Sequence, residues 1–175
     1  MQTHDLIPMS RASILRYTQL IRSKLGIPDA EPYVDIVRVL EFFLPKYFPD
    51  LRSEILSVEE MGEHHGLTYP NRNLILIRED VYDGACQGRG RDRFTIAHEI
   101  GHLLLHEGVD PRYARRDPMK PVPAYLDPEW QSNAFAGYLL MSPHAIQGMT
   151  PSEVATACGV SYEAATVQLK ILAKK

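Results

Sequence analysis

The sequence has little of what marks secreted, membrane-spanning or disulfide-stabilised proteins. Its two cysteines, Cys86 and Cys158, lie far apart and form no C-x-x-C pair, so we expect neither a disulfide framework nor a thiolate metal site. His4, Asp5 and Pro8 interrupt the N-terminus where a signal peptide needs an unbroken apolar stretch, and no apolar run reaches the roughly 18 residues of a membrane span. We therefore expect a cytoplasmic protein without a membrane-spanning segment.

An excess of basic residues is also missing. The chain has 19 lysines and arginines against 22 acidic residues, which gives a formal net charge of −3. This balance provides no basic field for non-specific nucleic-acid binding, so we expect no nucleic-acid partner. What remains is an ordinary globular composition, 45% hydrophobic and 23% charged, in 175 residues, a length that can build one hydrophobic core.

The first third of the chain predicts two helices. Apolar residues recur at three- and four-residue steps after the possible cap Ser10, as far as the break at Gly26. A second stripe with the same period runs from Tyr33 to Leu44, and Pro45 is expected to end it. Both helices are expected to pack on the core.

Short extended runs then predict a small antiparallel sheet. These runs lie at residues 55–58, 67–69 and 74–77, and the turn residues 70–73 join the last two.

Helices are expected again in the second half of the chain. One starts at the possible cap Asp92 and continues to His106, before an irregular, proline-rich connection over residues 108–128. Another starts near Asp127 or Pro128 and ends before Pro143, and the tail after residue 150 predicts two short helices broken at Gly159.

The helix from Asp92 carries the pattern His98-Glu99-x-x-His102. Residues i and i+4 share one face of a helix, so both imidazoles can reach one ion with bonds of about 2.1 Å. Glu99 faces the same cleft and is expected to act as general base toward a metal-activated water rather than as a ligand. The pattern therefore predicts a catalytic zinc site, which needs a third protein ligand and an open position for water.

Several residues are candidates for the third ligand. His106 continues the same helical face, but a rise of about 1.5 Å per residue separates its backbone from that of His98 by about 12 Å, so we expect a packing or supporting role. His64, His65 and His144 are not excluded by geometry, yet no helical pattern directs them to the site.

Glu129 is the candidate that a pattern does direct to the site. It opens a helix with an apolar face, and Asn133 follows one turn later, where its side chain can accept a hydrogen bond from a ligand imidazole. The helix dipole also favours a carboxylate in a first turn, and this alone would explain a glutamate at that position.

Two stretches together resemble the ImmA/IrrE family of zinc metallopeptidases. They are the run from Arg91 to His106, which contains R-F-T-I-A-H-E-I-G-H, and the run from Glu129 to Met141. The resemblance covers roughly residues 30–172 and implies that His98, His102 and Glu129 bind zinc, with Glu99 catalytic. The sequence departs from the family at Ser132, usually alanine, and at Ser142, which intervenes between the methionine and the proline.

The resemblance also implies an architecture and a substrate. We expect an α+β fold in which a small antiparallel sheet packs with helices in a zincin-like metallopeptidase domain with a helical C-terminal tail. One domain would span residues 1–175, with N-terminal helices over 1–50, the sheet and zinc-site helices over 53–148, and a helix-turn-helix-like tail over 150–175. Similar proteins in bacteria and mobile elements cleave a helix-turn-helix repressor, which implies a zinc endopeptidase that relieves repression.

A substrate peptide could add as a further strand to an edge near Leu74 to Ile77. Because these residues are apolar on both faces, burial inside the sheet explains them equally well. Tyr113, Tyr125 and His144 are candidates for stabilising an oxyanion.

The alternative function is a DNA-binding regulator with a structural zinc site. Residues 151–169 have the helix, glycine-containing turn and second helix of a helix-turn-helix unit. The second helix, however, opens with Tyr162 and Glu163 where arginine or asparagine would contact bases. Structural zinc sites also usually close with four protein ligands.

Overall fold

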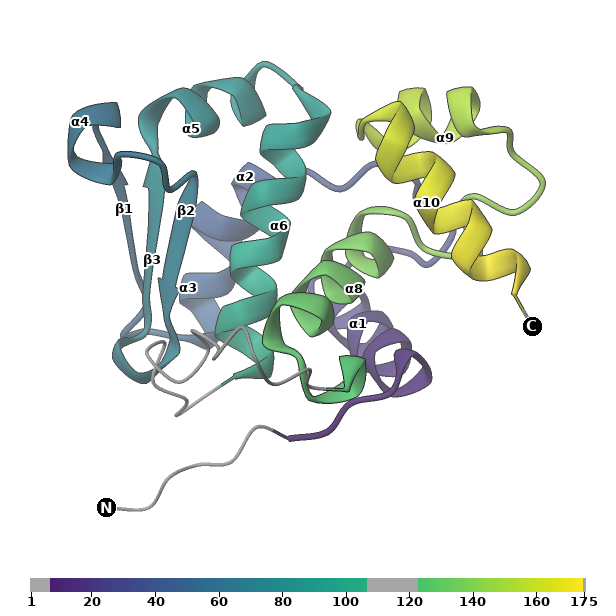
Figure 1. The fold of residues 1–175 in the computed structure, drawn as a ribbon, viewed down its shortest axis with the longest axis horizontal. Helices are drawn as coiled ribbons and strands as arrows, with labels where there is room; N and C mark the ends of the chain where they lie inside the picture. Colours follow the sequence, from purple (N-terminus) through teal and green to yellow (C-terminus); the bar gives the residue numbers. More distant parts are fainter. Residues whose placement is uncertain (1–6, 107–122, 175) are drawn as a thin grey trace.

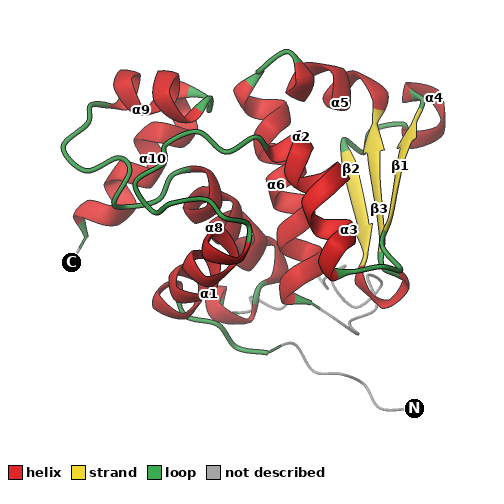
Figure 2. Cartoon of the chain, turned by 180° about the vertical axis from the view of Figure 1, so that it is seen from behind, coloured by secondary structure: helices red, strands yellow, loops and turns green. Residues whose placement is uncertain are grey.

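Helices precede and follow a group of three short strands in the computed structural model, which describes residues 7–106 and 123–174 (Figure 1). The strands are β1 (Arg52–Leu56), β2 (Gly66–Tyr69) and β3 (Leu74–Arg78). The main helical elements are α1 (Arg11–Lys24), α2 (Ile36–Arg38), the π-helical η1 (Val39–Phe43), α3 (Leu44–Tyr47), α4 (Val58–Met61), α5 (Glu79–Cys86), α6 (Gly90–Leu105), α8 (Pro128–Leu140), α9 (Pro151–Cys158) and α10 (Tyr162–Ala173). The sheet lies at one side of a mostly helical molecule, so the expected α+β class is confirmed (Figure 2).

The short 3-10 turns η2 (Pro70–Arg72) and η3 (Ala124–Leu126) complete these elements. Most of the irregular connection expected over residues 108–128 lies outside the described residues. Within the described residues, no helix is long and apolar enough to cross a membrane.

The first predicted helix is confirmed as α1. The side chain of Ser10 caps it by accepting a hydrogen bond from the backbone N–H of Ser13, and the helix ends at Lys24, just before Gly26. Ile14 and Thr18 bury one face of α1, which contacts α8.

The second predicted helix starts later and ends later than expected. It begins at Ile36, capped by Asp35, and it continues through Pro45 to Tyr47. A π-helical turn makes this possible, because the N–H of Leu44 bonds to the carbonyl of Val39, five residues back. Pro45 then lies in the first turn of α3, where a missing N–H is tolerated. The prediction that Pro45 ends the helix was therefore wrong.

The sheet is mixed rather than wholly antiparallel. The hairpin of β2 and β3 is antiparallel, as its four-residue connection predicts, but β1 pairs parallel to β3. Val58, expected in an extended run, instead starts α4 behind the Ser57 cap. The strand order β1-β3-β2 makes β3 the central strand, so Leu74 to Ile77 form no edge, and of the two alternatives for these residues, burial inside the sheet is the one that holds.

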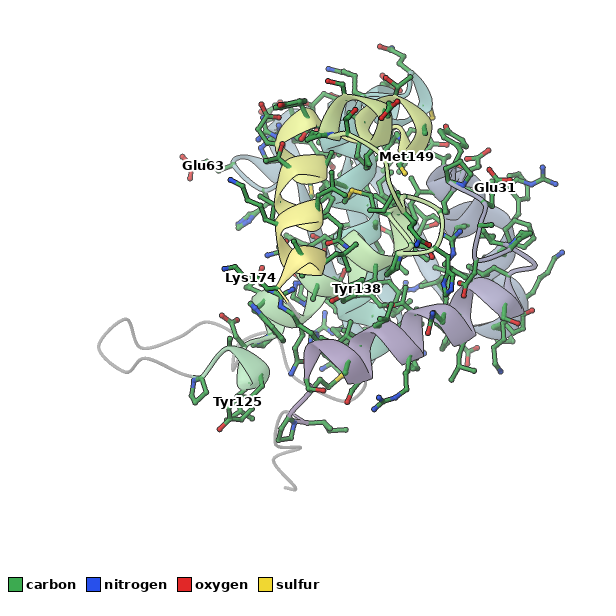
Figure 3. The ribbon with its side chains drawn as sticks, turned by 90° about the vertical axis from the view of Figure 1, so that its right-hand side faces the viewer. Glu31, Glu63, Tyr125, Tyr138, Met149 and Lys174 are labelled. Carbon is green, nitrogen blue, oxygen red and sulfur yellow. The ribbon has the colours of Figure 1, made fainter. Side chains whose placement is uncertain are left out.

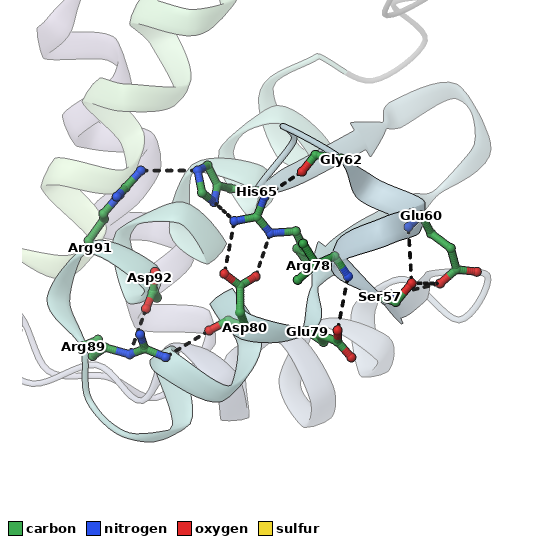
Figure 4. A network of polar contacts seen from close by, with 11 residues as sticks. Ser57, Glu60, Gly62, His65, Arg78, Glu79, Asp80, Arg89, Arg91 and Asp92 are labelled. Atoms are coloured by element: carbon green, nitrogen blue, oxygen red, sulfur yellow. Dashed lines mark hydrogen bonds and ion pairs between the residues drawn. The ribbon is translucent and has the colours of Figure 1, made fainter.

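A polar network ties the sheet to the helices that follow it (Figure 4). Arg78, at the end of β3, forms a bidentate contact with Asp80 and donates to the carbonyl of Gly62 at 2.7 Å. The ring of His65 lies between the guanidinium groups of Arg78 and Arg91, at 2.9 Å and 3.3 Å. The start of β2, the end of β3 and the first turn of α6 are thus held together.

The long helix α6 begins at Gly90, two residues before its expected start. Asp92 is therefore not the N-cap; it lies in the first turn and pairs with Arg89 at 3.2 Å. Helix α8 starts where the sequence predicts, after the Asp127 cap. The two helices pack closely at Gly101, because a Cβ added there would lie 3.1 Å from the Phe135 ring.

One of the two serines that depart from the family pattern lies in this packed contact. Ser132 is fully buried, and its hydroxyl has no hydrogen-bond partner in the described part of the chain. A buried hydroxyl without a partner costs on the order of 1–3 kcal/mol. We expect Ser132→Ala to raise the free energy of unfolding by about 1 kcal/mol, measured by urea denaturation, whereas Ser152→Ala on the exposed face of α9 should leave it unchanged. A destabilised Ser132→Ala protein would contradict this expectation.

The tail forms the two predicted helices, α9 and α10, with Gly159 at their junction. They lie beside α8, with α10 in the foreground of Figure 3. Gln168 of α10 donates to the carbonyl of Met141, and the backbone at Val160 and Ser161 touches Gly90 of α6.

A buried arginine holds this junction. Arg93 of α6 donates to the carbonyl of Gly159 at 2.8 Å, to the carbonyl of Val34 at 2.8 Å and to the hydroxyl of Tyr33 at 2.7 Å. Its guanidinium also lies 4.2 Å from the centre of the Tyr33 ring. One side chain therefore joins α6 to the segment before α2 and to the turn between α9 and α10.

Candidate metal centre

Helices α6 and α8 bring three ligand-type side chains together. His98 and His102 lie one turn apart on α6, and their Nε2 atoms are 3.0 Å apart. Glu129, in the first turn of α8, places one oxygen 3.2 Å from His98 Nε2 and the other 3.3 Å from His102 Nε2. Among the described residues, these three alone form a cluster that could hold a metal ion.

The spacing of the two imidazole nitrogens and the two oxygens of Glu129 fits a small cation. Tetrahedral bonds of about 2.1 Å place ligand atoms about 3.4 Å from one another. The distances of 3.0 Å, 3.2 Å and 3.3 Å come close to that value. The geometry therefore suits zinc coordination by two imidazoles and one carboxylate.

The hydrogen bond of His98 assigns its tautomer. Its Nδ1 lies 3.1 Å from the amide oxygen of Asn133, one turn after Glu129 on α8. An amide oxygen only accepts, so the imidazole carries its hydrogen on Nδ1. In the neutral ring, Nε2 of His98 is then a free lone pair directed at the cluster.

A longer chain of hydrogen bonds assigns the tautomer of His102. The amide nitrogen of Gln131 donates to the carbonyls of Ile7 and Tyr125, so its oxygen must face His106 Nε2, which lies 2.9 Å away and donates to it. Burial lowers the pKa of His106 to about 4, so its ring is neutral near pH 7 and its Nδ1 accepts. His102 Nδ1, at 3.2 Å, is therefore the donor, which leaves His102 Nε2 as a free lone pair.

These assignments leave three electron-pair donors facing one another without a hydrogen between them. The two imidazoles beside it, those of His102 and His98, hold the pKa of Glu129 far below its usual value, so this side chain is a carboxylate. Two lone pairs and a carboxylate at such short distances repel unless a cation or protons lie between them. The donor set thus fits a resident metal ion.

Glu99 lies beside the cluster but outside it. Its side chain is 6% exposed, and its carboxylate oxygen Oε2 is 2.6 Å from the hydroxyl of Thr68 on β2. Glu99 follows His98 directly on α6, so a buried carboxylate stands next to the metal-type ligands without joining them.

The sequence comparison agrees with this site. Residues 55–170, about two-thirds of the chain, match the IrrE N-terminal-like domain of the peptidase family M78 (Peptidase_M78). The chain belongs to the M78 peptidase family. No individual curated protein matches the sequence significantly. The matched region of this M78 peptidase includes both helices of the cluster as well as α9 and most of α10.

The other histidines considered from the sequence, His64, His65 and His144, lie away from the M78 cluster. His65 belongs to the network with Arg78 and Arg91, and His64 is exposed beside it. His144 is exposed near Asp29, past the far end of α8 from Glu129, too distant to stabilise an oxyanion at the cluster. The half-exposed Tyr125 lies just before α8. Tyr113 lies outside the described residues.

Two polar residues of the site were missed in the sequence. Gln131 could have been noticed, because it is a polar side chain on a helix face of otherwise apolar residues. Thr68 gave no signal, since only the fold brings it to Glu99, 31 positions along the chain.

Proposed function

We propose that this M78 peptidase is a zinc endopeptidase in which His98, His102 and Glu129 hold the metal and Glu99 is the general base. The observation that carries the proposal is the convergence of two free imidazole lone pairs and a carboxylate at 3.0–3.3 Å. Two imidazoles and one carboxylate with a fourth position open are the ligand set of catalytic zinc.

The proposed chemistry is hydrolysis of a peptide bond. When bound, zinc supplies Lewis-acid chemistry that makes water a nucleophile near neutral pH. Glu99 accepts a proton from the attacking water and passes it to the leaving amine, which balances the proton transfer over the reaction. The neighbouring Thr68 and the low exposure of Glu99 keep this carboxylate in one place.

We propose that the substrate docks as an extended strand along the edge of β2 that faces away from β3. The backbone N–H of Arg78 donates to the carbonyl of His65, so residue pairs 65–78, 67–76 and 69–74 bond across the β2–β3 ladder. The backbone groups of Gly66 and Thr68 then point away from β3, and they have no backbone partner among the described residues. An extended peptide bonded to this edge would pass beside Glu99.

We propose a helix-turn-helix repressor as the substrate, as the family resemblance implies. Cleavage in an extended segment of the repressor would relieve repression. We also propose that the enzyme acts in the cytoplasm, a location supported by its unpaired cysteines, one exposed and one buried.

DNA binding by α9 and α10 is the weaker alternative. Helix α9 and most of α10 fall within the region that matches the peptidase domain, and Arg93 bonds the turn between the two helices. Buried Val154, Cys158 and Ala165 give the pair a packing role that requires no nucleic acid.

Metal analysis and cleavage test the proposal together. We expect about one zinc per chain in protein purified without chelator. We also expect this protein to cut the repressor encoded beside its gene into discrete fragments, with activity lost in EDTA and restored by zinc. Zinc content far below one per chain, not raised by added zinc, would refute the metal centre. Cleavage that persists in EDTA with the zinc removed would refute the metal-dependent mechanism.

A further inference from the structure

Two residues of β2 surround the carboxylate of Glu99, and neither is a metal-type ligand. The hydroxyl of Thr68 lies 2.6 Å from Glu99 Oε2 and 3.1 Å from the backbone carbonyl of Glu99. Both atoms are acceptors, so Thr68 is the donor to Glu99 while its carboxyl group is ionised. The hydrogen bond reaches from a strand to a helix, so it depends on how β2 packs on α6.

Gly66 provides the space that this carboxylate occupies. A Cβ added at Gly66 would lie 2.7 Å from Cγ, 2.8 Å from Oε1 and 2.9 Å from Cδ of Glu99, all closer than atoms normally approach. Alternate residues of a strand face the same side, so Gly66 and Thr68 both face α6 while Leu67 faces the other way. Gly66 and Thr68 therefore form the surface of β2 against which the Glu99 side chain packs.

We propose that Gly66 and Thr68 are positioning residues that hold Glu99 for proton transfer. This inference rests on the proposed function, in which Glu99 is the base. Thr68 donates a hydrogen bond to Oε2. Oε1 lies in the space beside Gly66 and is then the oxygen that accepts a proton from water. An O–H bond of water breaks as Oε1–H forms, and Oε1–H then breaks as the proton moves to the amine nitrogen. Oε2 remains an acceptor for Thr68 throughout, so the carboxyl group need not turn.

The same two residues also direct backbone groups to the free edge of β2. A peptide bonded to Gly66 and Thr68 would thus be aligned by the residues that align the base. One short strand would orient both the substrate and Glu99. Correct orientation of the reacting groups lowers the activation barrier of the reaction.

The test compares Thr68→Val, which keeps the shape of the side chain, with Thr68→Ser, which keeps the hydroxyl. A hydrogen bond to a charged group contributes enough to change a rate by about 10- to 100-fold. We expect Thr68→Val to lower kcat on the repressor by this factor with KM and zinc content unchanged, and Thr68→Ser to restore most of it. Thr166→Val on α10, whose hydroxyl bonds to its own helix at Tyr162, is the matched control and should behave as wild type.

A binding measurement separates this inference from the choice of substrate. Acetohydroxamic acid binds zinc and shares a proton with a neighbouring carboxylate, so its affinity reports where Glu99 lies. By calorimetry on the zinc-loaded proteins, we expect about 10-fold weaker binding to Thr68→Val and wild-type binding to Thr68→Ser. If the wild-type protein binds the hydroxamate but does not cut the repressor, the proposed substrate is wrong. The hydroxamate affinities of Thr68→Val and Thr68→Ser then still test the positioning role of Thr68.

Gly66→Ala should displace the carboxylate and lower kcat further, provided that the variant melts near the wild-type temperature. If Gly66→Ala does not fold, the comparison of Thr68→Val with Thr68→Ser still tests the proposal. Unchanged kcat and hydroxamate affinity in Thr68→Val, or equal losses in the valine and serine variants, would overturn the inference.

Discussion

Replacing Glu99 with glutamine is expected to leave a folded, zinc-loaded protein that no longer hydrolyses its substrate. The amide keeps the size of the side chain and can still accept the hydrogen bond from Thr68, but it cannot take a proton from water. Loss of a general base lowers rates by roughly 10² to 10⁴-fold. Zinc content, melting temperature and cleavage rate should be measured on one preparation, so that activity and metal binding are compared directly.

Glu59→Gln is the matched control for this substitution. Glu59 is exposed on α4, away from the cluster, and the same chemical change there should leave the cleavage rate unaltered. A purely structural zinc site would give Glu99 no role, so full activity of Glu99→Gln at full zinc occupancy would contradict the proposed mechanism.

Replacing Glu129 with alanine should remove most of the metal affinity. The substitution deletes one of three proposed ligands, whereas His106→Ala deletes a residue that would act on the metal only through its hydrogen bond with His102. Partners that orient a ligand typically change affinity by about 10- to 100-fold, so we expect a loss in that range for His106→Ala and a larger loss for Glu129→Ala. Competition with a chromogenic chelator measures both.

His144→Ala is the control for general effects of removing a histidine, because His144 is exposed past the far end of α8. We expect it to bind zinc as wild type does. If His106→Ala empties the site and Glu129→Ala keeps the metal, the ligand assignment is wrong.

The helices of the site could be predicted because their signals are local. The spacing of His98 and His102 requires only the helical period, and the cap Asp127 with Pro128 marks the start of α8 before Glu129. The position of Glu129 beside both histidines, however, depends on the close packing of α6 and α8 at Gly101, which no local pattern contains.

One error arose where a partner distant in sequence decides the outcome, and others arose from local structure. The β2–β3 hairpin follows from its short turn, but nothing near β1 indicates that it pairs parallel to β3. Pro45 normally ends a helix, and the π turn before it accommodates the ring. Helix α5 was not predicted, although Glu79 and Asp80 in its first turn, with Val81 and Ala85 buried one turn apart, were signals for it.

The polar partners of the site had the weakest sequence signals. His106 was expected in a packing or supporting role, but its position between His102 and Gln131 depends on helix packing. The contact of Thr68 with Glu99 joins a strand to a helix. Such pairs are specified by tertiary structure, since each residue alone is compatible with many environments.

The buried side chain of Arg93 has a consequence for how the two proposed functions can be separated. Truncation after residue 149 would remove the carbonyls of Cys158 and Gly159 that accept from Arg93, together with the buried Val154, Cys158 and Ala165, which belong to the same hydrophobic core as α6 and α8. Removing several buried apolar side chains typically costs several kcal/mol, a large share of the stability of a domain this size. Deleting α9 and α10 would therefore disturb the peptidase itself, and a phenotype of the shortened chain would be no evidence for DNA binding.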